Sequence, residues 1–263
     1  MVKAWPHEGI TPIELWDVRV GDSTLYRLRD APSFYRSLAG AVLALRSGKA
    51  VRDGGGRLPA APWDAVALVG GALDETAARD AFDAAGIALD VVAADPFFAS
   101  SHAREVLAEF GPAYDGAVVI DVGQTSVKGA GPTTRIHRAR AAGAVALDAR
   151  AELVRYVASV LADACAGTAP GFVLLALPCE VEARGGALVL GTSTYPTAGE
   201  GEALVREILA SAGCESAASA VVNDAILAAW ALARRVPSQT QSRLVLTLGL
   251  GVGAALVDRT PAA

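Results

Sequence analysis

Two stretches of the chain carry an apolar strand pattern that runs into a glycine-containing turn and then resumes as a second strand. They are VVIDVGQTSVKGA, residues 118–130, and LVLTLGLGVGAALVD, residues 244–258. A hairpin of this kind directs backbone N–H groups into the space beyond the strand ends, which suits a phosphate oxygen. Each stretch is therefore either a plain hairpin or a phosphate-binding hairpin.

Hydrophobic periodicity places these hairpins among further strands and helices. Several predicted strands are short apolar runs rather than strict alternations, which indicates sheets covered on both faces. The predicted strands span residues 13–20, 65–70, 88–94, 116–123, 126–131, 133–140, 171–178, 186–191, 217–223, 243–249 and 253–258. The predicted helices span residues 33–48, 74–86, 100–111, 147–167, 201–213 and 224–236. Strands in hairpin clusters with helices between them predict an α/β fold with mixed sheets.

Composition and charge narrow the classes of protein to consider. The 263-residue chain is 52% apolar and 19% charged, which is typical of a compact globular protein with one large domain or two smaller ones. Its formal net charge is −5, and its sequence shows no cluster of Lys and Arg that could neutralise a run of phosphates. We therefore expect no nucleic-acid partner.

Cysteine usage and the apolar segments indicate a cytoplasmic location. Cys165, Cys179 and Cys214 are far apart in the sequence and form no CxxC pair, which is typical of reduced buried thiols rather than of disulfides or a zinc site. The start of the chain lacks the pattern of a signal peptide, and the most apolar segment is too short and too glycine-rich to span a bilayer. The glycine-rich segment 51–62 is either a linker or a surface loop.

The first hairpin contains the first group of candidate site residues. Gly123, Gln124 and Thr125 form its turn, where backbone N–H groups and the Thr125 hydroxyl could hold a phosphate. Asp121 ends the apolar run, where burial is costly without a partner, and a hydrated Mg²⁺ would provide that partner. Lys128 either strengthens the local electrostatic field at this site or is a solvent-exposed strand residue.

The second hairpin repeats the design with Gly249, Gly251 and Gly253. A dinucleotide-binding motif is excluded, because such a motif opens a long helix with an acidic residue about 20 positions further on. Here the chain continues as a strand. A P-loop is excluded as well, because the sequence contains no GxxxxGK[ST] pattern.

Two strand-to-helix junctions complete the candidate site. Gly70 and Gly71 follow an apolar strand, where they either allow an adenine or ribose to approach the backbone or form a tight turn. Asn223 and Asp224 stand where another strand becomes a helix, so both are suited to be helix N-caps. The alternative is that Asp224 acts as a general base toward a hydroxyl group.

Taken together, these segments resemble the acetate and sugar kinase/Hsp70/actin superfamily, and within it the ROK family of bacterial sugar kinases and repressors. DVGQTSVKGA is similar to the first phosphate motif of that family, and LTLGLGVGAALV is similar to the second. LALPCEV and the stretch that starts at GGALVLG resemble its PGPV and NLPGW segments. VVNDAILAAWALA resembles its ENDANAAALGE motif, which implies that Asp224 is the catalytic base and Asn223 a substrate contact.

The order of these motifs implies a circular permutation. The adenosine motif of the family follows the second phosphate motif, whereas the similar stretch VALVGGALDE comes first here. Residues 1–113 would then follow residue 258 in structural order, which needs only neighbouring termini and an exposed former loop. PIELWDVRV near the N-terminus resembles the GExGH segment that comes next in the family, with Glu14 in the Glu position.

The resemblance implies a two-lobed, actin-like or ribonuclease H-like ATPase fold, in which mixed five-stranded sheets with flanking helices close on Mg-ATP. We expect one lobe over residues 114–222 and a discontinuous lobe over residues 1–113 plus 223–263. The implied activity is ATP-dependent phosphoryl transfer to a hydroxyl of a small molecule such as a sugar, with ATP and Mg²⁺ as cofactors. A homodimer is compatible with these expectations.

Departures from the family pattern keep two other functions open. Gln124 replaces a glycine of the first motif, Cys179 and Glu180 replace the Gly-Pro of the sugar pocket, and Asp17 stands where the family has the His of GExGH. The zinc-binding cysteine cluster of the family is also missing from the sequence. The alternatives are a non-catalytic sensor of a nucleotide or sugar and an ATPase of the actin or Hsp70 type that acts on a protein partner.

Overall fold

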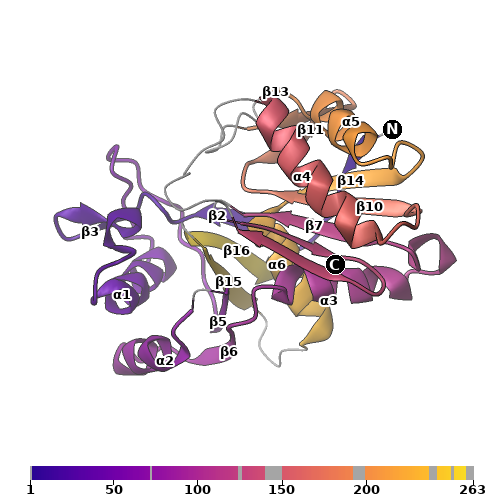
Figure 1. Ribbon diagram of the computed structural model, residues 1–263. Coiled ribbons are helices and arrows are strands. Elements are labelled where there is room, and N and C mark those ends of the chain that lie inside the picture. The colour runs from indigo at the N-terminus through magenta and orange to yellow at the C-terminus, as the bar shows by residue number, and fades with distance from the viewer. Residues whose placement is uncertain are drawn as a thin grey trace, which may run out of the picture. The chain divides into compact units, whose positions relative to one another are not determined.

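The computed structural model describes residues 2–71, 73–123, 126–139, 150–191, 199–236, 242–249 and 252–258. The chain divides into two compact units, shown with their elements in Figure 1. Unit 1 contains Met1–His7 and Ala99–Arg235, and unit 2 contains Glu8–Phe98 and Val236–Ala263. Both units are α/β with mixed sheets and flanking helices, as the periodicity predicts.

Unit 1 is built on a six-stranded sheet with the order β1-β14-β10-β7-β8-β9. Neighbouring strands from β1 to β7 run parallel, whereas β8 and β9 continue antiparallel as a meander. Its strands are β1 (Val2–Ala4), β7 (Val118–Val122), β8 (Ser126–Ala130), β9 (Arg135–Ala139), β10 (Phe172–Leu177) and β14 (Ala218–Asn223). A small antiparallel sheet contains β11 (Val181–Arg184), β12 (Ala187–Leu190) and β13 (Gly199–Glu200). The helices are α3 (Phe98–Glu109), the 3₁₀ helix η2 (Pro112–Tyr114), α4 (Arg150–Cys165), α5 (Gly201–Ser211) and α6 (Asp224–Arg235).

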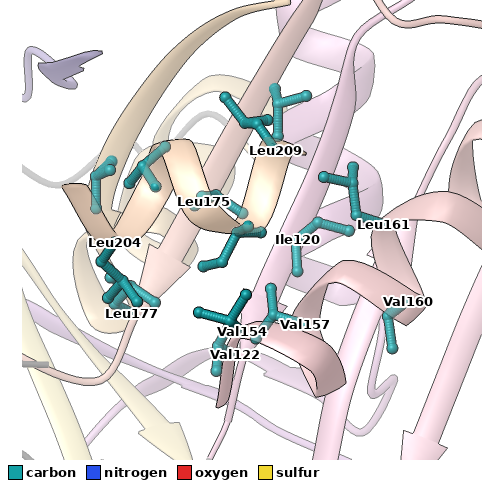
Figure 2. Close-up of a cluster of buried hydrophobic side chains, with 14 of the residues drawn as sticks. Ile120, Val122, Val154, Val157, Val160, Leu161, Leu175, Leu177, Leu204 and Leu209 are labelled. Carbon is teal, nitrogen blue, oxygen red and sulfur yellow. The ribbon is translucent and has the colours of Figure 1, made fainter. Parts of the chain in front are cut away.

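The core of unit 1 explains why its central strands are continuous apolar runs. Every residue of β7 and β10 is buried, and helices α4 and α5 contribute leucine and valine side chains to the same cluster. Figure 2 shows this packing, with Ile120 of β7 near Val157 and Leu161 of α4, and with Leu175 of β10 in the same cluster. Burial of apolar side chains at this density stabilises the strands whose ends form the candidate site.

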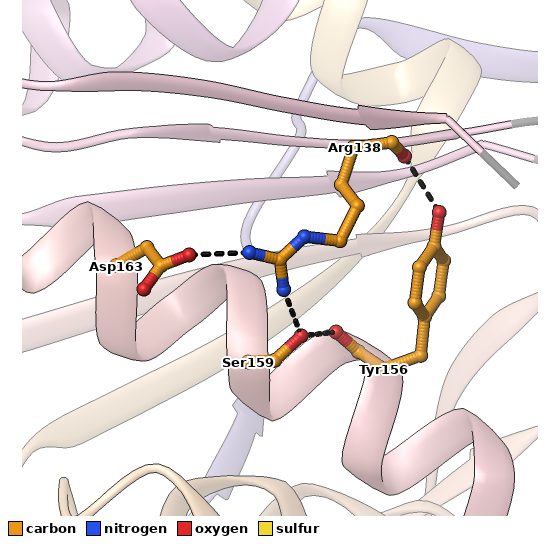
Figure 3. A network of polar contacts seen from close by, with 4 residues as sticks. All are labelled: Arg138, Tyr156, Ser159 and Asp163. Atoms are coloured by element: carbon orange, nitrogen blue, oxygen red, sulfur yellow. Dashed lines mark hydrogen bonds and ion pairs between the residues drawn. The ribbon is translucent and has the colours of Figure 1, made fainter.

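A polar network ties the outer strand β9 to helix α4 (Figure 3). The guanidinium of Arg138 donates to Ser159 and pairs with Asp163, and the hydroxyl of Tyr156 donates to the Arg138 carbonyl at 2.6 Å. The Ser159 hydroxyl in turn donates to the Tyr156 carbonyl at 2.7 Å. These contacts hold the outer part of the meander against α4, where β9 has alternating exposed and half-buried residues.

Unit 2 is built on a five-stranded sheet with the order β2-β16-β15-β5-β6. Its strands are β2 (Ile10–Glu14), β5 (Ala65–Val69), β6 (Leu89–Ala93), β15 (Ser242–Leu248) and β16 (Val252–Asp258). A separate hairpin contains β3 (Arg19–Val20) and β4 (Ser23–Thr24), and the helices are η1 (Leu25–Leu28), α1 (Phe34–Arg46) and α2 (Glu75–Ala84). The helices α1 and α2 pack their apolar faces, including Leu38 and Phe82, into one core with β5 and β15.

The two sheets share one pattern of strand directions. In unit 1 the strands β9, β8 and β7 are antiparallel neighbours, after which β10 and β14 are added parallel to β7. In unit 2 the strands β2, β16 and β15 are antiparallel neighbours, after which β5 and β6 are added parallel to β15. The difference lies in the chain path, because the third strand of the meander, β2, comes from the N-terminal part of the chain.

The unit boundaries differ from the predicted division at residues 114–222. Strand β1 and helices α3 and α6 belong to unit 1. Strand β1 pairs with β14, and the ring of Trp5 contacts the rings of Phe110 and Trp230, at 6.5 and 5.4 Å between centroids. Arg235 of α6 forms ion pairs with Glu105 and Glu109 of α3. These contacts tie α3, α6 and the N-terminal strand to one sheet.

One local expectation needs correction, the open choice for segment 51–62 is decided, and the prediction of reduced buried thiols is confirmed. The strand predicted over residues 13–20 is replaced by β2 and the short β3, because the chain turns between them. Segment 51–62 does not link the units but lies within unit 2, where Leu58 is buried. The Cys165 and Cys214 sulfurs lie 3.7 Å apart as free thiols, a contact between residues far apart in the sequence.

In the described part of the chain, no helix is long and apolar enough to cross a membrane.

Candidate functional site

The candidate residues of unit 1 gather at the carboxyl ends of the parallel strands β7, β10 and β14. Asp121 is the fourth residue of β7, Gly123 follows that strand, Asn223 ends β14, and Asp224 begins α6. β10 lies between β7 and β14, and Ala176 pairs with both Asp121 and Val222. In open α/β sheets, ligands bind outside the carboxyl ends of parallel strands.

Asp121 and Lys128 form an ion pair across the β7–β8 hairpin. They are directly opposite in the antiparallel register, and the Nζ of Lys128 lies 3.1 Å from Oδ2 of Asp121. Their side chains are only 12% and 18% exposed, respectively. A carboxylate this well buried needs a partner. Lys128 is that partner among the described residues, so the structure excludes one of the two roles left open for Lys128, that of a solvent-exposed strand residue.

The two carboxylates and the ammonium of this cluster act on one another electrostatically. Burial by itself lowers the pKa of Lys128, but the Asp121 charge, the hydrogen bond to Asp121 and the Asp224 charge outweigh burial and raise it. Burial, and next the negative charge of Asp121, raise the pKa of Asp224 to about 7. Hydrogen bonding to backbone N–H groups and the charge of Lys128 oppose that rise. Asp224 can therefore exchange a proton near neutral pH.

Asn223 has the capping role that its position predicts. Its Oδ1 accepts hydrogen bonds from the backbone N–H groups of Ala225 and Ile226 at 2.9 and 3.2 Å. Its Nδ2 donates to the carbonyl of Cys179 at 3.0 Å, which ties the start of α6 to the segment after β10. Most of the hydrogen-bonding capacity of this amide is therefore used to position Asp224, which itself accepts from Ala225 at 2.8 Å.

The turn of the first hairpin is closed by a backbone hydrogen bond from the Gly123 N–H to the Ser126 carbonyl, at 2.9 Å. A Cβ on Gly123 would lie 3.2 Å from the Nζ of Lys128, so the absence of a side chain leaves this ammonium its position beside the turn. Gln124 and Thr125, which are predicted to face a phosphate, lie outside the described residues.

The candidate residues of unit 2 also gather at the carboxyl ends of parallel strands. Gly70 follows β5 and Gly249 follows β15, and these two strands are neighbours. A Cβ on Gly70 would lie 2.2 Å from the carbonyl oxygen of Leu248, and a Cβ on Gly71 would lie 2.7 Å from the Pro96 side chain. Both glycines are therefore required for close packing, which supports the alternative of a tight turn.

The remaining predicted residues lie on the outer part of the unit 2 sheet. Gly253 of β16 pairs in register with Glu14 of β2, so the segment resembling GExGH does lie beside the second hairpin. Glu14 is 59% exposed and forms a 2.6 Å ion pair with Arg52. Gly251 lies outside the described residues. The structure therefore forms two groups, one in each unit, and only the unit 1 group brings ionisable site residues together.

The donor atoms of this cluster are the carboxylate oxygens of Asp121 and Asp224. In the described ranges, no three His, Cys, Asp or Glu side chains gather in a way that could hold a metal ion. The two carboxylates Asp121 and Asp224 match the donor set of a Mg²⁺ that keeps most of its water ligands. Lys128 already contacts Oδ2 of Asp121, so a hydrated Mg²⁺ would share this carboxylate with an ammonium.

Sequence reasoning missed one residue at these strand ends. Arg29 of unit 2 donates a hydrogen bond from Nε to the carbonyl of Gly249 at 2.9 Å. It lies in segment 21–60, for which the motifs suggest no role, and no pattern in the sequence distinguishes it from other arginines.

Comparison with protein-family models, with curated proteins and with solved structures found no significant match.

Proposed function

We propose that this protein is an ATP-dependent phosphotransferase that acts on a hydroxyl group of a small molecule, with a sugar as the favoured acceptor class. The observation that supports it most is Asp224, a carboxyl group beside a second carboxylate and a lysine, with its pKa raised to about 7. A general base works best when its pKa lies near the working pH, and such a base contributes a rate factor of about 10² to 10⁴.

In this proposal Asp224 accepts the proton of the acceptor hydroxyl as the hydroxyl oxygen attacks the terminal phosphorus of ATP. The bond between that phosphorus and the bridging oxygen breaks, and ADP leaves. Asn223 and the start of α6 orient the Asp224 carboxylate. Lys128 and Asp121 set the charge around it, and Lys128 would stabilise negative charge on a transferred phosphoryl group. Bound Mg²⁺, held through water by Asp121, would neutralise phosphate charge. The glycines Gly70, Gly71 and Gly249 belong to unit 2, and their role in nucleotide binding stays a prediction.

The fold proposal that accompanies this activity is a circularly permuted actin-like ATPase fold. It is supported by the strand pattern that both sheets share, in which the N-terminal strand β2 follows β16 in space. The N–H of Asp258 donates to the carbonyl of Gly9 at 2.8 Å, so the end of β16 lies beside the start of β2. A chain that starts at residue 114 and joins residue 258 to residue 2 by a flexible linker is expected to fold cooperatively, as measured by thermal unfolding.

The direct test of activity is ADP release from Mg-ATP with a panel of hexoses, N-acetylhexosamines and polyols. The wild type is compared with Asp224→Asn, and with Glu202→Gln as a matched control in the first turn of another helix of unit 1. We expect acceptor-dependent release that falls about 10²- to 10⁴-fold in Asp224→Asn and is unchanged in the control. In the wild type, the rate should rise with pH through an apparent pKa near that of Asp224.

A second candidate is a non-catalytic nucleotide or sugar sensor. The Asp121–Lys128 ion pair favours it, because this pair satisfies the buried carboxylate without a metal ion. The same experiment separates the two proposals. Binding of ATP without turnover on any acceptor would exclude the kinase proposal and leave the sensor. ATP hydrolysis that needs no acceptor would instead point to the ATPase alternative.

A further inference from the structure

Arg29 is held in a defined place at the end of strand β15. It follows η1 and precedes α1, and its Nε donates to the Gly249 carbonyl at 2.9 Å. The centre of its guanidinium group lies 4.7 Å from the centroid of the Phe34 ring. A backbone acceptor and an aromatic face therefore position the planar guanidinium group, so little side-chain entropy remains to be lost when it binds a ligand.

The charge of Arg29 is not neutralised by any carboxylate in the described ranges. The ion pairs of unit 2 involve Arg52, Arg79 and Arg243, and none involves Arg29. Its one hydrogen bond to a described residue uses Nε, which leaves the N–H groups of both terminal nitrogens for another acceptor. Guanidinium stays protonated at any physiological pH, so this charge is permanent.

The surroundings of Gly249 suit an anion. Gly249 follows β15, the first strand of the second hairpin, and a Cβ built on it would meet nothing within 4 Å. A group can therefore approach the backbone there, next to the terminal nitrogens of Arg29. Gly249 and Gly70 lie at the same edge of one sheet, the edge at which ligands of α/β proteins bind.

We propose that Arg29 binds a phosphate group of a nucleoside diphosphate or triphosphate at the carboxyl end of β15. A guanidinium group with two free terminal nitrogens matches two oxygens of one phosphate group, which an ammonium group cannot do. The choice of a nucleotide rests on the proposed function, whereas the anion site itself rests on the geometry of Arg29 and Gly249. The proposal gives a role to segment 21–60, which the motifs leave without one.

The test is calorimetric titration of the full chain with ADP, with inorganic tripolyphosphate and with adenosine. Arg29→Gln removes the positive charge. Arg29→Lys keeps the positive charge but lacks the two terminal nitrogens of the guanidinium group. Arg27→Gln is the matched control. It removes the same charge two positions before Arg29, and the Arg27 side chain contacts Tyr26 instead of the hairpin. The loss of a charged hydrogen bond predicts affinity for ADP and tripolyphosphate about 10- to 100-fold weaker in Arg29→Gln.

Adenosine affinity should be the same in all variants, because adenosine has no phosphate group. Arg29→Lys should recover only part of the lost affinity. Equal ADP affinity in Arg29→Gln and Arg27→Gln would overturn the inference, and so would a wild type that binds neither ADP nor tripolyphosphate. If Arg29→Gln has a lower melting temperature, the folded Arg29→Lys variant decides the outcome through its affinity.

The inference and the proposed function can fail separately. ADP binding that depends on Arg29, together with no turnover on any acceptor, would leave the phosphate site standing and contradict the kinase. Acceptor-dependent turnover with unchanged ADP affinity in Arg29→Gln would leave the kinase standing and exclude Arg29 as a phosphate ligand.

Discussion

Asp121 and Lys128 act on the proton affinity of Asp224 in opposite directions. Asp121 raises the pKa of Asp224 by like-charge repulsion, and Lys128 lowers it by attraction, while burial makes the largest contribution. We therefore expect Asp121→Asn to lower the pKa of Asp224 and Lys128→Met to raise it. Carbon-13 NMR titration of the Asp224 carboxyl group measures both shifts. Glu207→Gln, an exposed acid paired with Arg150, is the control and should leave this pKa unchanged. Shifts in the same direction would contradict the assigned geometry.

The titration of Asp224 also predicts how stability depends on pH. The folded chain keeps the proton of Asp224 up to about pH 7, whereas the ordinary pKa of 3.8 applies to the unfolded chain. Stability from this group is therefore lost as pH rises from about 4 to about 7, because the folded state then binds more protons than the unfolded state.

Asp224→Asn removes this titration and keeps an acceptor oxygen for the start of α6. Its free energy of unfolding should equal that of the wild type near pH 4 and exceed it by about 2 to 4 kcal/mol at pH 8. Urea unfolding of both proteins at the two pH values measures the difference. A variant that is less stable than the wild type at pH 8 would show that the Asp224 charge stabilises the fold.

At the scale of elements, the two glycines that end neighbouring strands of unit 2 have opposite packing. Gly70 has the Leu248 carbonyl 2.2 Å from where a Cβ would be, and Gly249 has nothing within 4 Å. We expect Gly70→Ala to destabilise the chain by about 1 to 3 kcal/mol, because the backbones of β5 and β15 must move apart. Gly249→Ala should change stability by less than about 0.5 kcal/mol. Chemical denaturation of the two variants measures both values, and equal effects would contradict the close approach of these strands.

The helices and strands also show which elements can be predicted from the sequence without a structure. All six predicted helices exist, because each has its own apolar face at helical spacing and its own end signals. The hairpins β7–β8 and β15–β16 were predicted for the same local reason. Strand β1 was missed because three residues carry no usable period, and the prediction of a strand over residues 13–20 ran past the turn after Glu14.

At the scale of the whole molecule, the chain crosses between its two units more than once. Trp5 belongs to unit 1, where it is 8% exposed and its ring contacts Phe172 and Trp230. Trp5→Ala should destabilise unit 1 by about 3 to 5 kcal/mol. Hydrogen exchange should accelerate in β14 and α6. Trp16→Ala is the control, because Trp16 is 49% exposed and belongs to unit 2, and its effect should stay below about 1 kcal/mol. Faster exchange confined to unit 2 in Trp5→Ala would contradict this assignment.

The sequence by itself determined the α/β class, the six helices, the two hairpins and the position of Asp224 at a strand-to-helix junction. These depend on periodicity and end signals within short windows, so neighbours along the chain suffice to predict them. Only the tertiary structure decided that Lys128 pairs with Asp121, that Asn223 ties the start of α6 to the Cys179 carbonyl, and that Arg29 lies at the Gly249 carbonyl. It also assigned β1, α3 and α6 to one unit. The physical reason is that strand register and long-range packing bring together residues from separate segments of the chain. A local sequence pattern does not predict which charged side chains will then lie opposite one another.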